Sequence, residues 1–299
     1  MSGAIDSVLV AVDGSEKVQP WVGRAIDIAG TLDADLHVLS VIDARELEPS
    51  LSYLESDERS ERERRFESGM EQTVETVASR ARTRLSGRIR TAVERGIPFE
   101  VITDYAETHA VDLIAVGTHG RGRVERALLG SVAERVMRTA TVPVLVIPPA
   151  VVEAEDGGYE DILLPTDGSE NADVAVEFGL DLADVYDATV HTVYSVDTGR
   201  LPEIGETTDL YAAIEETGRE ALESVRRRAR AADISVGGTI ARGPAARVIL
   251  SHSEEHDVDL IVMGTHGRSG IERHLIGSVT ETVVRNAAVP VCCVPMAEM

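Results

Sequence analysis

The chain contains one long segment twice, and this repeat constrains its architecture more than any other feature. Residues 116–148 read VGTHGRGRVERALLGSVAERVMRTATVPVLVIP, and residues 263–295 read MGTHGRSGIERHLIGSVTETVVRNAAVPVCCVP, at a constant offset of 147. The beginnings repeat as well, as VLVAVDGSE from Val8 and ILLPTDGSE from Ile162. Because 299 residues are enough for about two ordinary domains, we expect tandem copies of one domain, over residues 1–149 and 158–299.

Each copy alternates two hydrophobic periodicities. In the first, residues 8–12, 36–42, 88–93, 112–117 and 142–147 are apolar runs typical of strands buried on both faces. Between them, apolar residues spaced by three and four predict helices over 21–29, 66–85, 99–109 and 131–140. This alternation predicts an α/β fold, a doubly wound five-stranded parallel sheet with helices on both faces. The second copy shows the same pattern.

Two features follow predicted strands and so lie at strand carboxyl ends. Asp13 and Asp167 follow the first strand of each copy, and a glycine-rich segment, 117–131 or 264–278, follows the fourth. In open parallel sheets, ligands bind at the carboxyl ends of strands where the strand order reverses. If the first and fourth strands are neighbours, the aspartate and the glycines face one crevice.

The glycine-rich segment has the chemistry of an anion site. Gly117 and Gly120 lack a Cβ, so the backbone can approach a ligand closely. Gly130 and Ser131 precede a helix whose first N–H groups are unpaired and favour phosphate. Asp13 can accept hydrogen bonds from an adenine amino group or from ribose hydroxyls. A base at one end and phosphates at the other describe a nucleotide.

An alternative needs no ligand. Ser131 with Glu134, and Ser278 with Glu281, match the Ser-x-x-Glu capping box. Glycine before a helix is also ordinary turn chemistry. A capping box would not, however, require Gly117 or Gly120.

The G-x-x-G-x9-G-[ST] pattern after the fourth strand, with an aspartate ending the first, resembles the ATP-binding members of the universal stress protein family. The resemblance covers nearly the whole chain as two copies, and implies a Rossmann-like, adenine nucleotide alpha hydrolase-like fold. It implies ATP, or AMP or ADP, with Mg²⁺ as a companion, as the ligand. In the first copy it implies contacts from Asp13, Val41, Gly117, Gly120, Gly130, Ser131 and Val132. In the second, the matching residues are Asp167, Gly264, Gly267, Gly277, Ser278 and Val279, and Ser195 stands where Val41 does.

The resemblance leaves three functions open. The first is a nucleotide-binding stress-response or signalling protein with unidentified protein partners. The second is a slow ATPase, although no motif places a general base beside the phosphates and the chain has no G-x-x-x-x-G-K-[ST] sequence. The third is a scaffold with vestigial sites.

The two copies differ around the glycines. The second copy has PTD before its aspartate and Gly270 in the glycine segment, whereas the first has AVD and Arg123. The second copy is therefore closer to the family pattern, and we expect it to bind the nucleotide more tightly. Arg121, Arg123 and Arg268 are candidates for phosphate contacts, and equally for solvated surface residues.

Charge excludes some partners. Acidic residues number 52 against 29 basic ones, a formal net charge of −23, and Lys17 is the single lysine. Such a polyanion is repelled by nucleic acid and by anionic membranes. An acid-rich, lysine-poor composition suits a halophile with salt-rich cytoplasm, where self-repulsion is screened. A GC-rich genome is the alternative explanation. The N-terminus does not resemble a signal peptide, so we expect a cytoplasmic protein.

The remaining chemistry-bearing residues give weaker patterns. Cys292 and Cys293 are adjacent in a predicted strand, so their side chains point to opposite faces and are expected to be small buried hydrophobes rather than metal ligands. His252 and His256 have the i, i+4 spacing of a zinc-binding pair without an evident third ligand. We therefore predict no metal site.

The last strand of each copy, VPVLVIP and VPVCCVP, is an apolar edge segment that needs covering. Members of the family dimerise through these strands, so the resemblance implies that the two copies pack as an intramolecular pseudo-dimer. Further homo-oligomerisation stays open.

Overall fold

The computed structural model describes residues 5–15, 18–45, 56–118, 129–149, 151, 158–197, 207–267 and 276–296. The chain divides into two compact units. The first unit is Gly3–Gly157, and the second is Gly158–Met299 together with Met1–Ser2. Each unit is described by itself.

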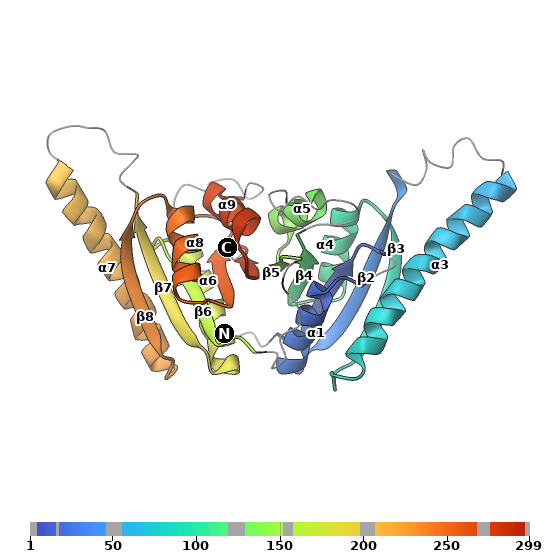
Figure 1. Ribbon diagram of the computed structural model, residues 1–299, viewed down its shortest axis with the longest axis horizontal. Helices are drawn as coiled ribbons and strands as arrows, with labels where there is room; N and C mark the ends of the chain where they lie inside the picture. The colour runs from blue at the N-terminus through green and yellow to red at the C-terminus, as the bar shows by residue number, and fades with distance from the viewer. Residues whose placement is uncertain are drawn as a thin grey trace. The chain divides into compact units, whose positions relative to one another are not determined.

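The first unit alternates strands and helices along the chain (Figure 1). Its elements are β1 (Ser7–Val12), α1 (Trp21–Thr31), β2 (Asp35–Asp43), α3 (Ser56–Ala81), β3 (Ile89–Gly96), α4 (Pro98–Thr108), β4 (Leu113–Gly117), α5 (Ser131–Thr139) and β5 (Val144–Ile147).

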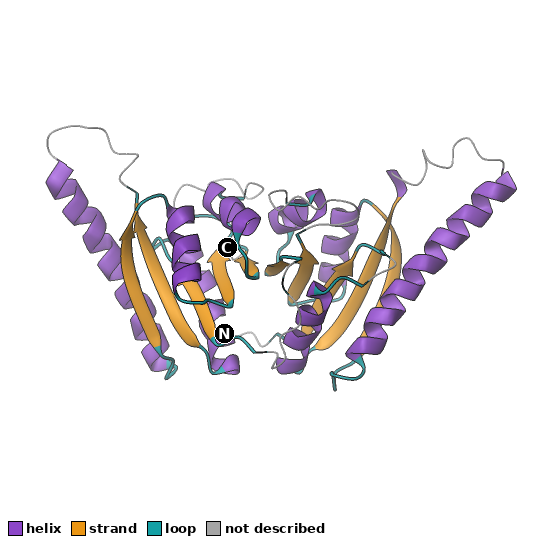
Figure 2. Ribbon diagram, in the orientation of Figure 1, coloured by secondary structure: helices purple, strands orange, loops and turns teal. Residues whose placement is uncertain are grey.

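The second unit repeats this order, and its helices and strands are distinguished by colour in Figure 2. Its elements are β6 (Asp161–Pro165), α6 (Glu170–Tyr186), β7 (Thr189–Val196), α7 (Thr207–Ala231), β8 (Val236–Arg242), α8 (Ala245–Glu255), β9 (Leu260–Gly264), α9 (Ser278–Asn286) and β10 (Val291–Val294).

Both sheets have the predicted doubly wound topology. The strand order is β3-β2-β1-β4-β5 in the first unit and β10-β9-β6-β7-β8 in the second. The pairs β1–β2, β1–β4, β6–β7 and β6–β9 are all parallel. The chain therefore reverses its direction of winding between β1 and β4, and again between β6 and β9. These are the neighbours that a crevice at the strand carboxyl ends requires.

The central strands are buried on both faces because helices cover each side of the sheet. In β1, Val8, Leu9 and Val10 are completely buried, and all of β5 and β10 is buried. Burying such a side chain stabilises the fold by about 1.5–3 kcal/mol relative to leaving it exposed. The helix facing β1 buries the five residues whose spacing predicts it, Trp21, Val22, Ala25, Ile26 and Ala29. The fold prediction is confirmed.

The two cysteines lie in β10 and are free thiols buried in the core. Burial raises the pKa of Cys293 to about 12 and raises that of Cys292 well above its usual range. Because the thiolate is the reactive form, these side chains act as small hydrophobes, as their sequence context predicts.

Within the described ranges, no helix combines the length and the apolar character that a membrane crossing requires.

Candidate functional site

The aspartate and the glycine segment end neighbouring strands in each unit. Ala11 of β1 pairs with Val116 of β4, so Asp13 and Gly117 leave the sheet side by side. In the second unit, Leu163 of β6 pairs with Ile261 of β9. The strand topology thus brings the two features to one edge, at the point where the strand order reverses.

A tight turn holds each aspartate. The carboxylate Oδ1 of Asp13 accepts hydrogen bonds from the Ser15 amide at 3.0 Å and from its hydroxyl at 2.7 Å. Asp167 Oδ1 accepts from the Ser169 amide at 3.0 Å. The intervening glycine has φ 66° in the first unit and 74° in the second, a left-handed conformation that glycine adopts without strain. Each residue of the repeated D-G-S sequence therefore has a local structural role that its sequence pattern alone did not indicate.

In the second unit the glycine segment closes against the aspartate. A Cβ built on Gly267 would lie 2.7 Å from Oδ2 of Asp167, so the bare backbone contacts the carboxylate. A Cβ on Gly264 would lie 3.1 Å from the Asn171 carbonyl oxygen, and one on Gly277 would lie 3.2 Å from that of Thr265. Contacts within the protein thus explain in part why glycine stands at positions 264, 267 and 277, independently of any ligand.

The helices that follow the glycines begin without a side-chain cap. The N-cap residue of α5 is Gly130 and that of α9 is Gly277, and neither helix has a side-chain capping hydrogen bond. Ser131 and Ser278 are the first helical residues rather than the caps. The capping-box alternative is therefore wrong, because the residue at the cap position has no side chain. The helix start keeps its positive dipole end and its N–H donors for another acceptor.

The backbone fixes where these helices begin. The Gly130 amide donates to the Thr118 carbonyl at 2.7 Å, and the Gly277 amide donates to the Thr265 carbonyl at 2.8 Å. In the second unit, the Thr280 hydroxyl also donates to the Gly264 carbonyl at 2.9 Å. The helix N-terminus is thereby held against the end of the fourth strand in both units.

His266 is the most unusual polar residue of this region. Its side chain is only 9% exposed, and its Nδ1 lies 2.9 Å from the Thr265 hydroxyl. Its Nε2 is buried and has no hydrogen-bond partner in the part of the chain that the structure describes. An unsatisfied buried polar group costs about 1–3 kcal/mol, so an acceptor or donor supplied by a ligand would recover stability here.

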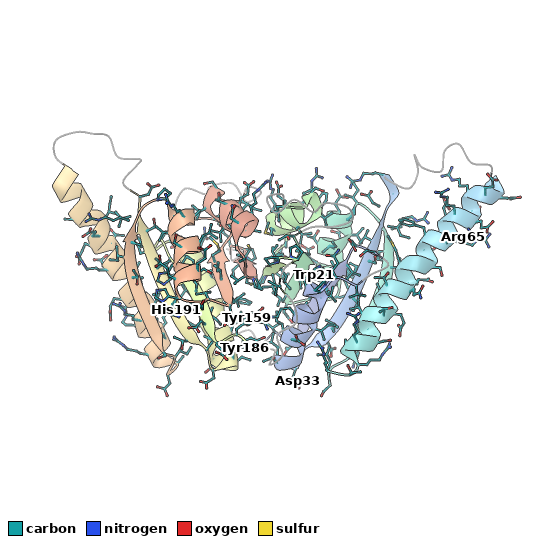
Figure 3. The ribbon with its side chains drawn as sticks, viewed as in Figure 1. Trp21, Asp33, Arg65, Tyr159, Tyr186 and His191 are labelled. Carbon is teal, nitrogen blue, oxygen red and sulfur yellow. The ribbon has the colours of Figure 1, made fainter. Side chains whose placement is uncertain are left out.

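The first unit holds its aspartate with additional side-chain hydrogen bonds. The Gln19 amide donates to Asp13 Oδ2 at 3.0 Å, and the Trp21 indole N–H donates to Gln19 Oε1 at 2.8 Å. The indole of Trp21 (labelled in Figure 3) packs on the end of β4, where a Cβ on Gly117 would lie 2.6 Å from its Nε1. The apolar spacing predicts only that Trp21 lies on a helix face, and no sequence pattern indicates that its ring reaches the end of the strand.

Other predicted site residues lie around the same edges. Val41 lies near the carboxyl end of β2 and is half-buried, and Val132 and Val279 are half-buried in the first turns of their helices. Ser195, at the position of Val41, donates its hydroxyl to the Gly243 carbonyl at 2.7 Å. Gly120, Arg121, Arg123, Arg268 and Gly270 lie outside the described residues.

The histidine pair of α8 has a third histidine beside it. The rings of His252 and His256 are 4.2 Å apart, and the ring of His191 on β7 is 5.0 Å from that of His256. His191 Nε2 lies 2.6 Å from Asp161 Oδ1. Within the described ranges, no group of three or more His, Cys, Asp or Glu side chains is arranged to hold a metal ion. These histidines lie at the amino end of β7, away from the glycine segment.

A doubly wound α/β unit with an aspartate and a glycine-capped helix at its switch point, present twice, defines a tandem Rossmann-like protein. The sequence model of the universal stress protein family matches residues 4–148 and 158–295. The chain therefore belongs to the universal stress protein family, as its motifs indicate.

Individual relatives support this assignment. A universal stress protein of Mycolicibacterium smegmatis is 28% identical over 295 residues, which cover 96% of each chain. The protein MJ0531 of Methanocaldococcus jannaschii, also a universal stress protein, is 34% identical over 148 residues, 48% of this chain and 87% of the relative. The crystal structure of a universal stress protein from Archaeoglobus fulgidus matches 97% of this chain with a TM-score of 0.66 at 22% identity, a likeness of fold.

Proposed function

We propose that this protein is an adenine-nucleotide-binding stress-response or signalling protein, with one site at the switch point of each unit. The nucleotide is ATP, or AMP or ADP. The proposal rests on the family's nucleotide-binding motif in both copies and on the aspartate and the uncapped helix start that the fold brings to one edge of the sheet.

Each group at this edge of the sheet has a role in this proposal. Asp167 accepts hydrogen bonds from the base or the ribose through its carboxylate. Ser278, Val279 and the uncapped N-terminus of α9 bind the phosphates, because this helix end carries N–H donors and a partial positive charge. Asp13, Ser131 and Val132 have the same roles in the first unit. Mg²⁺, when bound with ATP, would neutralise phosphate charge in a chain whose formal net charge is −23.

The observation that carries the proposal is the orphaned Nε2 of His266. A buried imidazole nitrogen without a partner in the described structure is costly. His266 lies directly before Gly267, whose backbone contacts Asp167. We propose that a ligand bound between the aspartate and the helix start reaches this nitrogen, which then donates to a phosphate or hydroxyl oxygen.

The two sites are expected to differ in affinity. In the first unit, both oxygens of Asp13 already accept hydrogen bonds from Ser15 and Gln19. In the second unit, Asp173 stands at the position of Gln19 and binds Arg228 instead, at 2.9 Å. The second copy also keeps PTD before its aspartate and Gly270 in its glycine segment, which is closer to the family pattern, and on this ground we propose that the second site is the tighter one.

Mass spectrometry of the denatured purified protein tests the proposal first, since a tight nucleotide is retained through purification. Calorimetric titration with ATP then measures affinity in the wild type and in His266→Phe. We expect an affinity loss of about tenfold in the variant, the value of one hydrogen bond to a charged group. Absence of any retained nucleotide, together with no heat on titration with ATP, ADP or AMP, would contradict the proposal. An ATPase assay on the same samples distinguishes a binding protein from an enzyme.

A further inference from the structure

The second unit contains a groove that the proposed nucleotide site does not use. It lies between the edge strand β8 and helix α8 and has a volume of about 290 Å³. Thr239 and Ala241 line it from the strand, and Arg247, Ser251 and Glu255 line it from one face of the helix. None of these residues is among the predicted nucleotide contacts.

One end of this groove is cationic. Arg242 lines it where β8 ends, and Arg247 lines it in the first turn of α8. Arg242 pairs with Glu215 at 2.8 Å across an exposed surface, whereas Arg247 makes no hydrogen bond or ion pair with the described residues. An unpaired guanidinium offers five donors in a planar fork suited to carboxylate and phosphate.

The duplicated chain supplies an internal comparison. Strand β3 of the first unit corresponds to β8 of the second. Leu36 pairs with Ile89 in the first unit, and their equivalents Val190 and Val236 pair in the same way in the second. Residues of β3 and α4 therefore have their equivalents 147 positions later, in β8 and α8. The first unit has Glu94, Glu100 and Asp104 at these positions, and the second unit has Ala241, Arg247 and Ser251. Three carboxylates are thus replaced by a methyl group, a guanidinium and a hydroxyl. In a strongly acidic chain, this local reversal of charge points to an anionic occupant.

We infer that the groove between β8 and α8 is a second ligand site, which takes a small organic anion through its carboxylate or phosphate group. Arg247 binds the anionic group, and Ser251 and Thr239 supply hydroxyl hydrogen bonds along the groove. The far end carries His252 and Glu255, which suit a hydrogen-bond donor on the same ligand. The first unit does not bind this ligand, because its three carboxylates repel anions.

The test uses the full chain, labelled with ¹⁵N, and monitors backbone amides and arginine side chains by NMR. Inorganic phosphate and succinate are titrated separately at constant KCl, with neutral glycerol as a control, so that the phosphate and carboxylate arms are distinguished. We expect saturable shifts at Arg247, Gly243 and Val248 with at least one anion. The equivalent Gly96 and Val101 of the first unit should not move.

Matched variants make the test decisive. Arg247→Glu copies the first unit and should weaken binding about tenfold or more, while Glu100→Gln in the first unit should leave it unchanged. If Arg247→Glu does not fold, the milder Arg247→Gln replaces it. The inference is overturned if neither anion gives saturable shifts, if all exposed arginines shift alike, or if the Arg247 variants bind normally. The variant Asp167→Asn should still show the NMR shifts at Arg247, so that failure of the nucleotide site can be distinguished from failure of the groove site. If this variant lost both nucleotide binding and the shifts at Arg247, the two would be one site.

Discussion

Asp167 and Gly267 are in contact across the switch point of the second sheet, although they follow different strands. A Cβ on Gly267 would lie 2.7 Å from the carboxylate oxygen Oδ2 of Asp167, well inside the normal contact distance. This contact joins the residue proposed to bind base or ribose to the segment proposed to bind phosphate. Any side chain at position 267 must therefore move the carboxylate.

This contact predicts the effect of Gly267→Ala. Because the obstacle is the end of a side chain, the carboxylate can move aside, and the free energy of unfolding should fall by only about 1 kcal/mol. Displacing the carboxylate should, however, weaken ATP binding about tenfold, measured by calorimetry. Gly237→Ala is the control, since an added Cβ there meets no atom within 4 Å. ATP binding by Gly267→Ala at wild-type strength would refute the prediction.

The uncapped start of α9 predicts that Ser278→Ala separates binding from stability. Ser278 is not the cap, so its removal should change the free energy of unfolding by no more than about 0.5 kcal/mol, while ATP affinity falls. Ser169→Ala is the matched control, because Ser169 caps α6 by accepting from the Ala172 amide at 3.2 Å. Its loss should cost about 0.5–2 kcal/mol in urea unfolding. Equal destabilisation by the two variants would restore the capping-box explanation.

The histidine cluster predicts loss of stability in acid. Burial, reinforced by His256 and His191, lowers the pKa of His252 below its ordinary value of about 6.5. Glu255 opposes this shift. His252 therefore binds a proton more readily in the unfolded chain than in the folded protein. Its contribution to the free energy of unfolding is complete above about pH 6.5 and is lost as the pH falls through the lowered pKa of the folded state.

The variant His252→Tyr tests this assignment. It copies the first unit, where Tyr105 occupies the equivalent position beside His37. Unfolding monitored by urea between about pH 7 and pH 5 should show a weaker pH dependence in the variant than in the wild type. An identical pH dependence in both proteins would show that His252 is not responsible.

The net charge predicts a dependence on salt. Exposed ion pairs such as Arg242–Glu215 weaken as salt rises, but each contributes only about 0.2–1 kcal/mol. Self-repulsion of a chain with a formal net charge of −23 is relieved at the same time. We expect the second effect to dominate, so that the free energy of unfolding rises with KCl up to molar concentration. Full stability in dilute buffer would count against the halophilic interpretation.

The architecture was predictable because it depends on periodicity and repetition. Buried runs such as Val8–Val12 and the spacing of Trp21, Ala25 and Ala29 are local signals, and the repeat allows each copy to check the other. The site was predictable only in outline. Two features could not be predicted: the packing of Trp21 on Gly117, and Gly277 rather than Ser278 as the N-cap residue of α9. Both depend on how segments distant in the sequence approach one another, which no local pattern encodes.

Differences between the two copies indicate where their sites differ. The amide of Gln19 holds Asp13 from its own loop, and this contact became apparent only from the folded geometry. The sequence does contain a signal, since Asp173 stands where the first copy has Gln19. Comparing the copies position by position is therefore the way to locate functional divergence in this chain.

Calorimetric titration of ATP into the wild type, Asp167→Asn and Asp13→Asn tests the central claim most directly. Asparagine keeps the Oδ1 acceptor of the D-G-S turn and removes the negative charge, so the turn should survive in both variants. We predict two sites in the wild type, with the tighter one weakened about tenfold in Asp167→Asn and the weaker one affected in Asp13→Asn. ATP binding that neither substitution changes, or no binding to the wild type, would contradict the assignment of the nucleotide sites to these crevices.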